Sequence, residues 1–579
     1  MHETSLIFHD CGAIEACIDH SPCSTTMAPT PEGFSITTEE LLLIAIVAVF
    51  AFVPRLSGHW LTRTENLAST FARRETLVLA VVAFASIAFR LALLPLFPVP
   101  VPAVHDEFAY LLGADTFTHG RLANPPHPMS VYFETFHVLQ YPTYASQYPP
   151  AQSAVLALGK LLGHPWIGVL LSMATMTAAI TWMLQGWFPP EWALLGGLTV
   201  LLRFCLSTYW VNSYWGGAIA ATGGALVLGA FPRILHHHRL RNSICLGIGA
   251  GVLANSRPLE GFIFCLPIAA ALAVWLFSSK SPSFRVTGPS VILPVLCILM
   301  LTLLFVGYYN WRITGKAFLF PEQLAIQQYE NTPLLVWQHQ SAARRYTNPQ
   351  FDYFYNVVVR NQCVPTWAGW GTRSTFFVLK VWQMFLGTIL SISFIMLLRL
   401  IRDRRMRLLW VQLCLSAAAL LVVVYLKPHY AAPLVATVFA LWVQSMRHLR
   451  RAKLFGRSVG IGLSRAIILA FVASSAISLV EAANVPRNLD FWSLHRAHFV
   501  KQLDQTPGYH LVIVRYQPDH YVHHEWVYNA ADIDHSKIVW AREIPGRDMQ
   551  PLLNYFRGRK IWLVEADTSP PRLLPYSGQ

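Results

Sequence analysis

Two adjacent carboxylates, Asp106 and Glu107, follow the second long apolar stretch of the chain. Ionisable groups at a membrane boundary are costly unless water or a partner compensates them, so such a pair indicates a functional site. A carboxylate placed there could act as a general base on a substrate group. Asp106 could instead cap a short helix beginning near Glu107 by accepting hydrogen bonds from its amide groups. The residue types alone leave both roles open.

Cationic side chains occur at other helix ends that we expect on the same side of the membrane. The turn from Lys427 to Tyr430 contains Lys427 and His429, and the helix break at residues 254–261 contains Arg257. Arg257 is equally well explained as an interfacial residue whose charged head reaches water. Arg344 and Arg345 are further cationic side chains on that side with a possible functional role, although a solvated surface explains this pair better.

Histidines in two places raise the question of a metal ion. His127, Glu134 and His137 lie in one aromatic stretch, but their irregular spacing disfavours a metal site. His520 and His524 stand four residues apart in a segment that is a poor helix candidate, so a structural or surface role is favoured there. The nine cysteines show no CxxC pair and no zinc-like spacing, which indicates small core residues.

The composition places these groups in a membrane protein. The 579 residues are 54% hydrophobic and only 13% charged, whereas an ordinary soluble domain carries roughly 25% charged residues. Many apolar runs approach the roughly 20 residues that cross a hydrocarbon core. The predicted spans are residues 40–54, 76–97, 165–187, 191–208, 216–232, 243–256, 259–277, 288–308, 375–398, 408–426, 430–446 and 461–481.

The distribution of charge predicts the topology. The chain carries a net charge of +14, and its basic residues form short clusters between apolar runs, which indicates a topology signal and not nucleic-acid binding. If all the clusters lie on one side, that side is cytoplasmic by the positive-inside rule. The opposite side then holds the loops 98–164 and 309–374, the turn at Lys427, and everything after about residue 482. Aromatic residues at the outer ends fit an interfacial belt better than a sugar site.

The region after residue 482 has a different pattern. Residues 510–515 and 560–564 predict short buried strands, and residues 490–505 and 547–557 predict helices. The sequence therefore predicts a mainly α protein in three parts. These are an N-terminal tail (1–38), a polytopic transmembrane helix bundle (39–481) and a small soluble α/β domain on the exterior or periplasmic face (482–579).

The first outer loop resembles that of the GT-C superfamily of integral-membrane glycosyltransferases. The residues that carry this resemblance are Asp106-Glu107, Tyr110, the turn Gly120-Arg-Leu-Ala-Asn-Pro125, and Tyr148-Pro-Pro-Ala-Gln152. The turn Lys427 to Pro433 is similar to a His-Tyr-x-x-Pro element of the bacterial branch related to protein O-mannosyltransferases and the lipid A aminoarabinose transferase. The chain departs from the aminoarabinose-transferase pattern at Gln147-Tyr148, where a lysine often precedes the two prolines.

The resemblance, which covers roughly residues 76–450, implies a polytopic fold of GT-C type and a reaction at the outer face of a bacterial inner membrane. In that reaction a sugar passes from a polyprenyl-phosphate donor to a glycan, lipid or protein acceptor, usually with inversion. Some relatives use a divalent metal ion and others do not, so no fixed cofactor is implied.

The resemblance also implies roles for individual residues. Asp106 is expected to be the general base, with Glu107 as the alternative. The residues expected to bind the donor phosphate are Lys427, His429, Tyr430 and Arg257. Those expected to line the substrate groove are Tyr110, Glu134 and Tyr148.

Two other classes of function stay open. A secondary transporter has a comparable number of spans, but transporters typically place polar residues at mid-membrane and show two related halves. Here the polar residues crowd the outer ends of the spans and the halves are dissimilar. A non-catalytic scaffold for envelope-polysaccharide assembly could use the C-terminal domain for docking. A soluble nucleotide-sugar transferase is disfavoured because neither a glycine-rich phosphate loop nor an Asp-x-Asp motif is evident on the cytoplasmic side.

Overall fold

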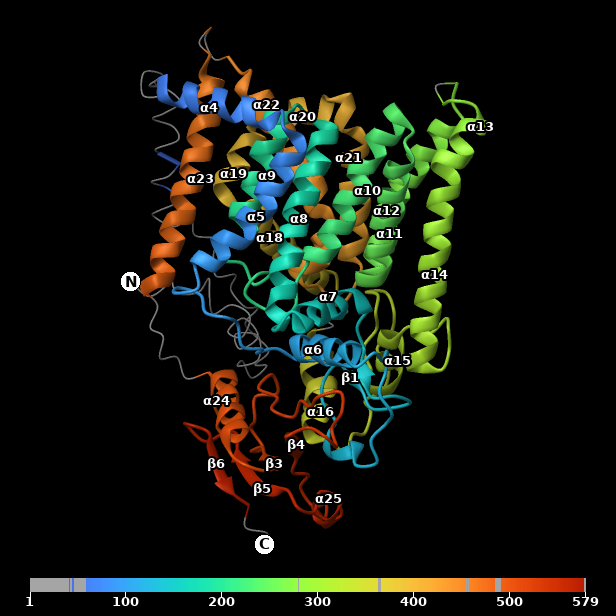
Figure 1. The fold of residues 1–579 in the computed structure, drawn as a ribbon, viewed down its shortest axis with the longest axis vertical. Helices are drawn as coiled ribbons and strands as arrows, with labels where there is room; N and C mark the ends of the chain where they lie inside the picture. The colour runs from blue at the N-terminus through green and yellow to red at the C-terminus, as the bar shows by residue number, and fades with distance from the viewer. Residues whose placement is uncertain are drawn as a thin grey trace.

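A computed structural model describes residues 41, 44–45, 59–279, 281–362, 366–453, 456, 458–484 and 491–576. The predicted tail 1–38 and nearly all of the predicted span 40–54 lie outside these residues. The described chain forms a helix bundle with a small α/β domain at one end (Figure 1), which confirms the predicted fold class.

Six helices of the described part are long and apolar enough to cross a membrane. They are α5 (Glu75–Ala92), α8 (Pro165–Trp187), α10 (Ala218–His237), α12 (Pro258–Leu276), the continuous α13 (Phe284–Thr287), η3 (Gly288–Ile292) and α14 (Leu293–Thr314), and α23 (Val459–Asn484). The apolar windows of α8 and α10 are 72% and 83% buried, whereas that of α14 is only 6% buried. The bundle is therefore centred on α8 and α10, and α14 stands at its edge (Figure 1).

Four shorter helices coincide with predicted spans. They are α9 (Pro190–Phe204), α11 (Leu240–Ser256), α21 (Arg407–Leu421) and α22 (Val435–Arg450). Their lengths of 15, 17, 15 and 16 residues fall below the roughly 20 residues that a straight span needs. Most residues of α22 are buried, so other parts of the protein surround this helix on nearly every side.

The predicted span 375–398 is not one straight helix. Helix α18 (Trp367–Phe385) is followed at 89° by α19 (Gly387–Ser391), η5 (Ile392–Met396) and α20 (Leu397–Arg402). Gly387 has φ of 65°, a conformation that only glycine adopts readily. Arg203 of α9 donates to the Met384 carbonyl at 2.9 Å and so satisfies a carbonyl near the end of α18.

The outer loops form short elements across one end of the bundle. In chain order they are α6 (His105–Thr118), η2 (Ser130–Tyr132), the hairpin β1 (Val138–Leu139) and β2 (Ala145–Ser146), α7 (Pro150–Leu161), α15 (Pro321–Tyr329), α16 (Pro349–Tyr353), η4 (Phe354–Val359), α17 (Arg360–Gln362) and η7 (Pro428–Leu434). Helices α6 and α7 lie between the bundle and the C-terminal domain (Figure 1).

The C-terminal domain consists of α24 (Trp492–Gln505), β3 (His510–Arg515), β4 (Ile538–Arg542), α25 (Gln550–Tyr555), β5 (Lys560–Glu565) and β6 (Arg572–Pro575). The strand order is β4-β3-β5-β6, with β3 parallel to β4 and β5, and β6 antiparallel to β5. The two predicted strands and two predicted helices are all present, whereas the pattern of hydrophobic residues did not reveal β4 and β6.

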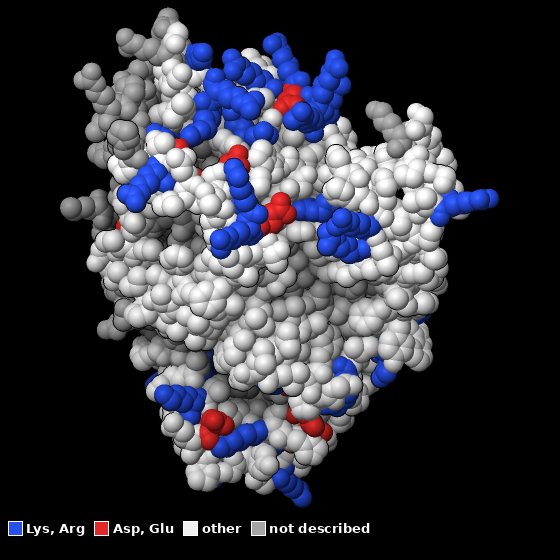
Figure 2. Space-filling view, turned by 45° about the horizontal axis from the view of Figure 1, so that its top comes forward, with Lys and Arg blue, Asp and Glu red and all other residues white. Residues whose placement is uncertain are grey.

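Basic residues gather at the end of the bundle opposite the C-terminal domain (Figure 2). Helix α4 (His59–Ala72) lies across this end, and the short η6 (Arg404–Met406) belongs to it as well. Glu65 of α4 forms ion pairs with Arg450 and Arg465 at 2.9 and 2.7 Å. The clusters that predicted one cytoplasmic side therefore meet at one end of the molecule.

Candidate active site at the outer end of the bundle

Glu107 fastens the start of α6 to the bundle. One of its carboxylate oxygens accepts hydrogen bonds from the backbone N–H groups of Ala103 and Val104 at 2.7 and 3.1 Å, and the other accepts from Tyr214 at 2.9 Å. Burial raises its pKa to about 7 despite these three bonds. The helix begins at His105, and the carboxylate that satisfies the backbone donors is Glu107. The alternative in which Asp106 caps a helix beginning near Glu107 is therefore wrong.

Asp106 points to a different partner. Its carboxylate accepts a hydrogen bond from the hydroxyl of Tyr148, the residue that precedes the Pro-Pro pair before α7. The Tyr148 ring stacks on that of Tyr110 with centroids 4.6 Å apart, and Ser153 of α7 donates to the Tyr110 carbonyl at 3.0 Å. Asp106 is only half-buried, so its position is fixed while a reactant can still approach it.

Arg257 and Tyr430 belong to the same group of side chains. Arg257 lies at the break between α11 and α12, and its guanidinium carbon is 4.0 Å from the centre of the Tyr430 ring. Burial raises the pKa of Tyr110, while the charge of Arg257 opposes this effect and that of Asp106 reinforces it. Tyr110, Asp106, Arg257 and Tyr430 are therefore close enough to interact electrostatically, although they come from three distant parts of the chain.

Two carboxylates that the sequence analysis did not single out complete this cluster. Burial raises the pKa of Glu322. The positive charge of Arg257 opposes this rise, and the negative charges of Glu260 and Asp106 add to it. Glu322 lies in the first turn of α15, and Glu260 in the first turn of α12. The local signals were an acidic residue three positions after Arg257 and another directly after Pro321. Neither signal points to Asp106 without the fold.

His429 links the late outer turn to residues 209–215, in the loop between α9 and α10. It is 2% exposed, its Nδ1 lies 3.0 Å from the Tyr209 hydroxyl, and its ring centre lies 4.7 Å from that of Trp215. The same loop donates the Tyr214 N–H group to Glu107. Lys427 is half-buried at the N-cap of η7, two residues before His429. Residues 209–215 therefore contact both the late outer turn, through His429, and the start of α6, through Glu107.

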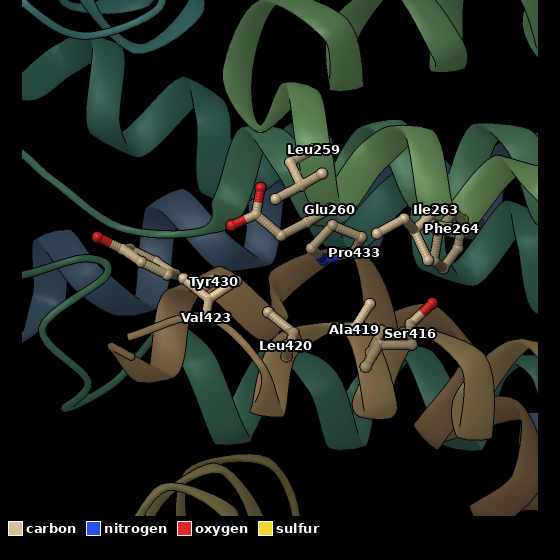
Figure 3. A pocket seen from close by; sticks show the side chains of 11 residues that line it. Leu259, Glu260, Ile263, Phe264, Ser416, Ala419, Leu420, Val423, Tyr430 and Pro433 are labelled. Carbon is tan, nitrogen blue, oxygen red and sulfur yellow. The ribbon is translucent and has the colours of Figure 1, made fainter. Parts of the chain in front are cut away.

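A narrow apolar crevice leads away from the cluster between α12 and α21 (Figure 3). Glu260 and Tyr430 stand at one end of it, and the other side chains that line it are Leu259, Ile263, Phe264, Ser416, Ala419, Leu420, Val423, Pro433 and Leu434. Its free volume is about 10 Å³, which is about the size of one water probe. A chain molecule could enter this crevice only if the two helices separated.

The predicted metal candidates do not come together. His127 lies 3.1 Å from the Asp534 carboxylate, and the Glu134 carbonyl accepts from Arg542, so both residues face the C-terminal domain. Burial raises the pKa of Glu134, and the positive charge of Arg542 opposes this rise. Across the part of the chain that the structure describes, no group of three or more His, Cys, Asp or Glu side chains is arranged to hold a metal ion.

His137 lies nearer to the Asp106 side, among other histidines. Its ring centre is 5.6 Å from that of Tyr148 and 5.8 Å from that of His105, which in turn is 5.4 Å from His523. Burial and the neighbouring histidines hold the pKa of His105 well below its usual range. His105 is therefore neutral, and it adds no positive charge beside Asp106.

Two further predicted groups have structural contacts. Arg344 donates to the carbonyls of Gln327 and Gln328 at 2.6 and 2.8 Å, and so it holds the end of α15. His520 is buried and pairs with Asp567 through its Nδ1. The His520 contact agrees with the structural or surface role that the sequence favours, whereas Arg344 is half-buried and bonded to backbone carbonyls instead of being freely solvated.

No protein-family model and no curated protein matches the chain. The chain is similar to the crystal structure of ArnT from Cupriavidus metallidurans in the apo state, with 12% identity, a TM-score of 0.45, and coverage of 85% of this chain and 93% of that chain. The same protein bound to undecaprenyl phosphate gives 12% identity, a TM-score of 0.44, and coverage of 84% and 92%. The crystal structure of an oligosaccharyltransferase from Archaeoglobus fulgidus in complex with Zn and sulfate gives 10% identity and a TM-score of 0.43, with coverage of 75% of this chain and 60% of that chain.

Proposed function

We propose that this protein is a membrane glycosyltransferase that moves a sugar from a polyprenyl-phosphate donor to an acceptor on the outer face of the inner membrane, with inversion. The observation that carries the proposal is the joining of Asp106 to Tyr148, Tyr110, Arg257 and Tyr430 at the outer end of the bundle. These are residues for which the sequence resemblance implied a role in this reaction. They come from separate segments, and the fold brings them together.

Asp106 is the general base in this proposal. An acceptor hydroxyl must lose its proton as it attacks the sugar, so a carboxylate must lie within hydrogen-bond reach of it. The hydrogen bond from the Tyr148 hydroxyl holds the orientation of the Asp106 carboxylate. Glu107 is unsuited to this role because its two oxygens are already engaged by three backbone donors.

Arg257 and Lys427 provide the positive charge that the leaving phosphate requires. As the bond to the sugar breaks, negative charge develops on the phosphate, and fixed cations stabilise it. Arg257 can hold two phosphate oxygens at once, while Lys427 supplies a point charge. The apolar crevice between α12 and α21 adjoins this cluster through Tyr430 and would take the prenyl chain. Separation of α12 and α21 would admit that chain.

The distribution of charge supports an outer location for this chemistry. The Arg-rich end of the bundle carries α4, whereas α6 and the C-terminal domain lie at the other end (Figure 1). By the positive-inside rule the Arg-rich end is cytoplasmic. Polyprenyl-linked sugars and their acceptors would then meet on the periplasmic or exterior side, next to the C-terminal domain.

The test is sugar release from a panel of radiolabelled polyprenyl-phosphate sugars by purified protein in detergent. We expect the wild type to consume one donor class. Asp106→Asn should lower turnover by about 100- to 10,000-fold, because this is the range that a general base contributes. Lys427→Ala should raise the KM for the donor more than it lowers kcat.

Thermal unfolding of each variant provides the folding control. Failure of folded wild-type protein to release sugar from any donor would overturn the proposal and favour the transporter or scaffold functions. Full activity of Asp106→Asn would overturn the assignment of the base.

A further inference from the structure

Helix α6 carries two different faces. Asp106 and Tyr110, four residues apart, lie on the face toward α7 and the Arg257 cluster. Phe108 and Asp115 are seven residues apart and therefore share another face, because seven residues make nearly two full turns. Phe108 is two positions from Asp106, so the two side chains leave the helix about 200° apart. One face presents the proposed base, and the opposite face contacts the C-terminal domain.

Phe108 belongs to the hydrophobic core of the C-terminal domain. It packs in one cluster with Trp492, Phe499 and Val512 of that domain. Its ring stacks on Tyr528 with centroids 4.0 Å apart and an angle of 2° between the planes. The guanidinium of Arg496 lies 4.9 Å from the Phe108 ring centre. The first turn of α6 thus inserts an aromatic side chain into a domain that begins nearly 400 residues later in the chain.

Arg496 and Tyr528 are themselves held in place. Arg496 donates to the carbonyls of Trp526 and Tyr528, each at 3.0 Å. The next residue, Asn529, exchanges two hydrogen bonds of 2.8 Å with the backbone of Trp540 in β4. The segment 526–531 is therefore fastened to the sheet, and it presents a rigid surface to α6.

Asp115 provides a second attachment, near the other end of α6. Its carboxylate accepts from the Ala531 N–H group at 2.7 Å and also pairs with Lys160 of α7. Segment 526–531 therefore contacts α6 at two points, which are separated by seven residues or roughly 10 Å along the helix axis. Two fixed points on one face restrict both the tilt and the rotation of α6.

We propose that the C-terminal domain is a positioning clamp for the helix that carries Asp106, with Tyr528 and Asp115 as positioning residues. This inference rests on the proposed function of Asp106. The clamp is needed because a base displaced by about 1 Å from its reactive geometry can lose 100-fold in rate. Donor binding relies on Arg257 and Lys427, which lie on other elements, so loosening the clamp affects the chemical step and leaves donor binding intact.

The test compares Tyr528→Leu with Tyr528→Phe, which retains the stacked ring. Arg515→Ala is the matched control, because Arg515 is an exposed residue of β3 whose ion-pair partner is Glu543 and not α6. We expect Tyr528→Leu to lower kcat at least tenfold with the donor KM within about twofold of the wild type. Hydrogen exchange in peptides covering 105–118 should be faster in this variant. Tyr528→Phe and Arg515→Ala should resemble the wild type in all three measurements.

Asp115→Asn tests the same proposal at the second attachment if Tyr528→Leu fails to fold. It keeps an acceptor oxygen for the Ala531 N–H group but removes the negative charge. We therefore expect a smaller decrease in kcat than for Tyr528→Leu, again with little change in the donor KM. Faster exchange of α6 with unchanged kcat would overturn the clamp, as would equal effects of Tyr528→Leu and Arg515→Ala. If wild-type protein shows no transferase activity at all, the proposed function fails, whereas the exchange data still report whether the domain restrains α6.

Discussion

The two ends of the bundle treat their carboxylates in opposite ways. At the Arg-rich end, burial alone would raise the pKa of Glu65, but hydrogen bonds and charges from Arg465 and Arg450 outweigh it and lower the pKa to about 2. At the other end, burial dominates. The pKa of Glu107 rises to about 7 and that of Glu330, at the end of α15, to about 8.

This difference separates a stabilising ion network from the proposed functional site. Paired charges at the Arg-rich end hold α4 against α22 and α23. At the outer end, carboxylates and tyrosines are buried around few cations, an arrangement typical of sites that complete their interactions with a substrate. Substitutions at the outer end should therefore affect function strongly, whereas those at the Arg-rich end should affect mainly stability.

The largest effect is expected for Glu107→Ala. This change leaves the N–H groups of Ala103, Val104 and Tyr214 without their acceptor, and each unsatisfied buried donor costs about 1–3 kcal/mol. We expect loss of both transfer activity and several degrees of thermal stability, measured by activity assay and thermal unfolding in detergent. Glu107→Gln keeps an acceptor oxygen and should lose less. Equal stability of Glu107→Ala and the wild type would contradict the fastening role.

A smaller effect is expected for the pH dependence of Glu330→Gln. The folded-state pKa of Glu330, about 8, lies above its ordinary value of 4.5. The folded protein therefore binds more protons than the unfolded chain between these values, and its stability falls as the pH rises through this window. Glu330→Gln should show a shallower fall in unfolding temperature between pH 5 and 8. Glu65→Gln should keep the wild-type slope, because the contribution of Glu65 is lost only as the pH falls below 4.5 toward 2. Parallel curves for Glu330→Gln and the wild type would remove this contrast.

The smallest effect on function is expected for Glu65→Gln itself. It weakens the pairs with Arg450 and Arg465, which are partly exposed, and such pairs contribute about 0.2–1 kcal/mol each. The unfolding temperature should fall by a few degrees, while turnover per folded molecule stays unchanged. A loss of turnover in well-folded Glu65→Gln protein would show that the two ends of the bundle are coupled.

Local patterns predicted much of the fold. Runs of apolar residues located the helices of the bundle, and the alternation of short apolar and polar segments located α24, β3, α25 and β5. The break at Gly387 was missed, because a single glycine in an apolar run does not reveal that Arg203 satisfies the carbonyl before it. Strand β6 was missed because its four residues are too few to show a period, and the five-residue strand β4 was missed as well.

The candidate site was predicted in part, for the same physical reason. Residue type and position beside an apolar run singled out Asp106 and Arg257, and the resemblance of the turn Lys427 to Pro433 added Tyr430. They could not show that Glu260 and Glu322 join them, since that depends on which helix ends meet. Nor could they place Glu134, whose carbonyl is bound by a residue more than 400 positions later.

The sequence by itself determined that this protein is a membrane helix bundle with an appended α/β domain and a carboxylate pair that follows an apolar helix. Hydropathy and periodicity are properties of neighbouring residues, so they can be read along the chain. The tertiary structure alone decided that Glu107 binds backbone donors while Asp106 faces Tyr148, and that Phe108 belongs to the core of the C-terminal domain. Hydrogen bonds and packing between distant segments depend on how the helices meet, and nothing local in the chain specifies those partners.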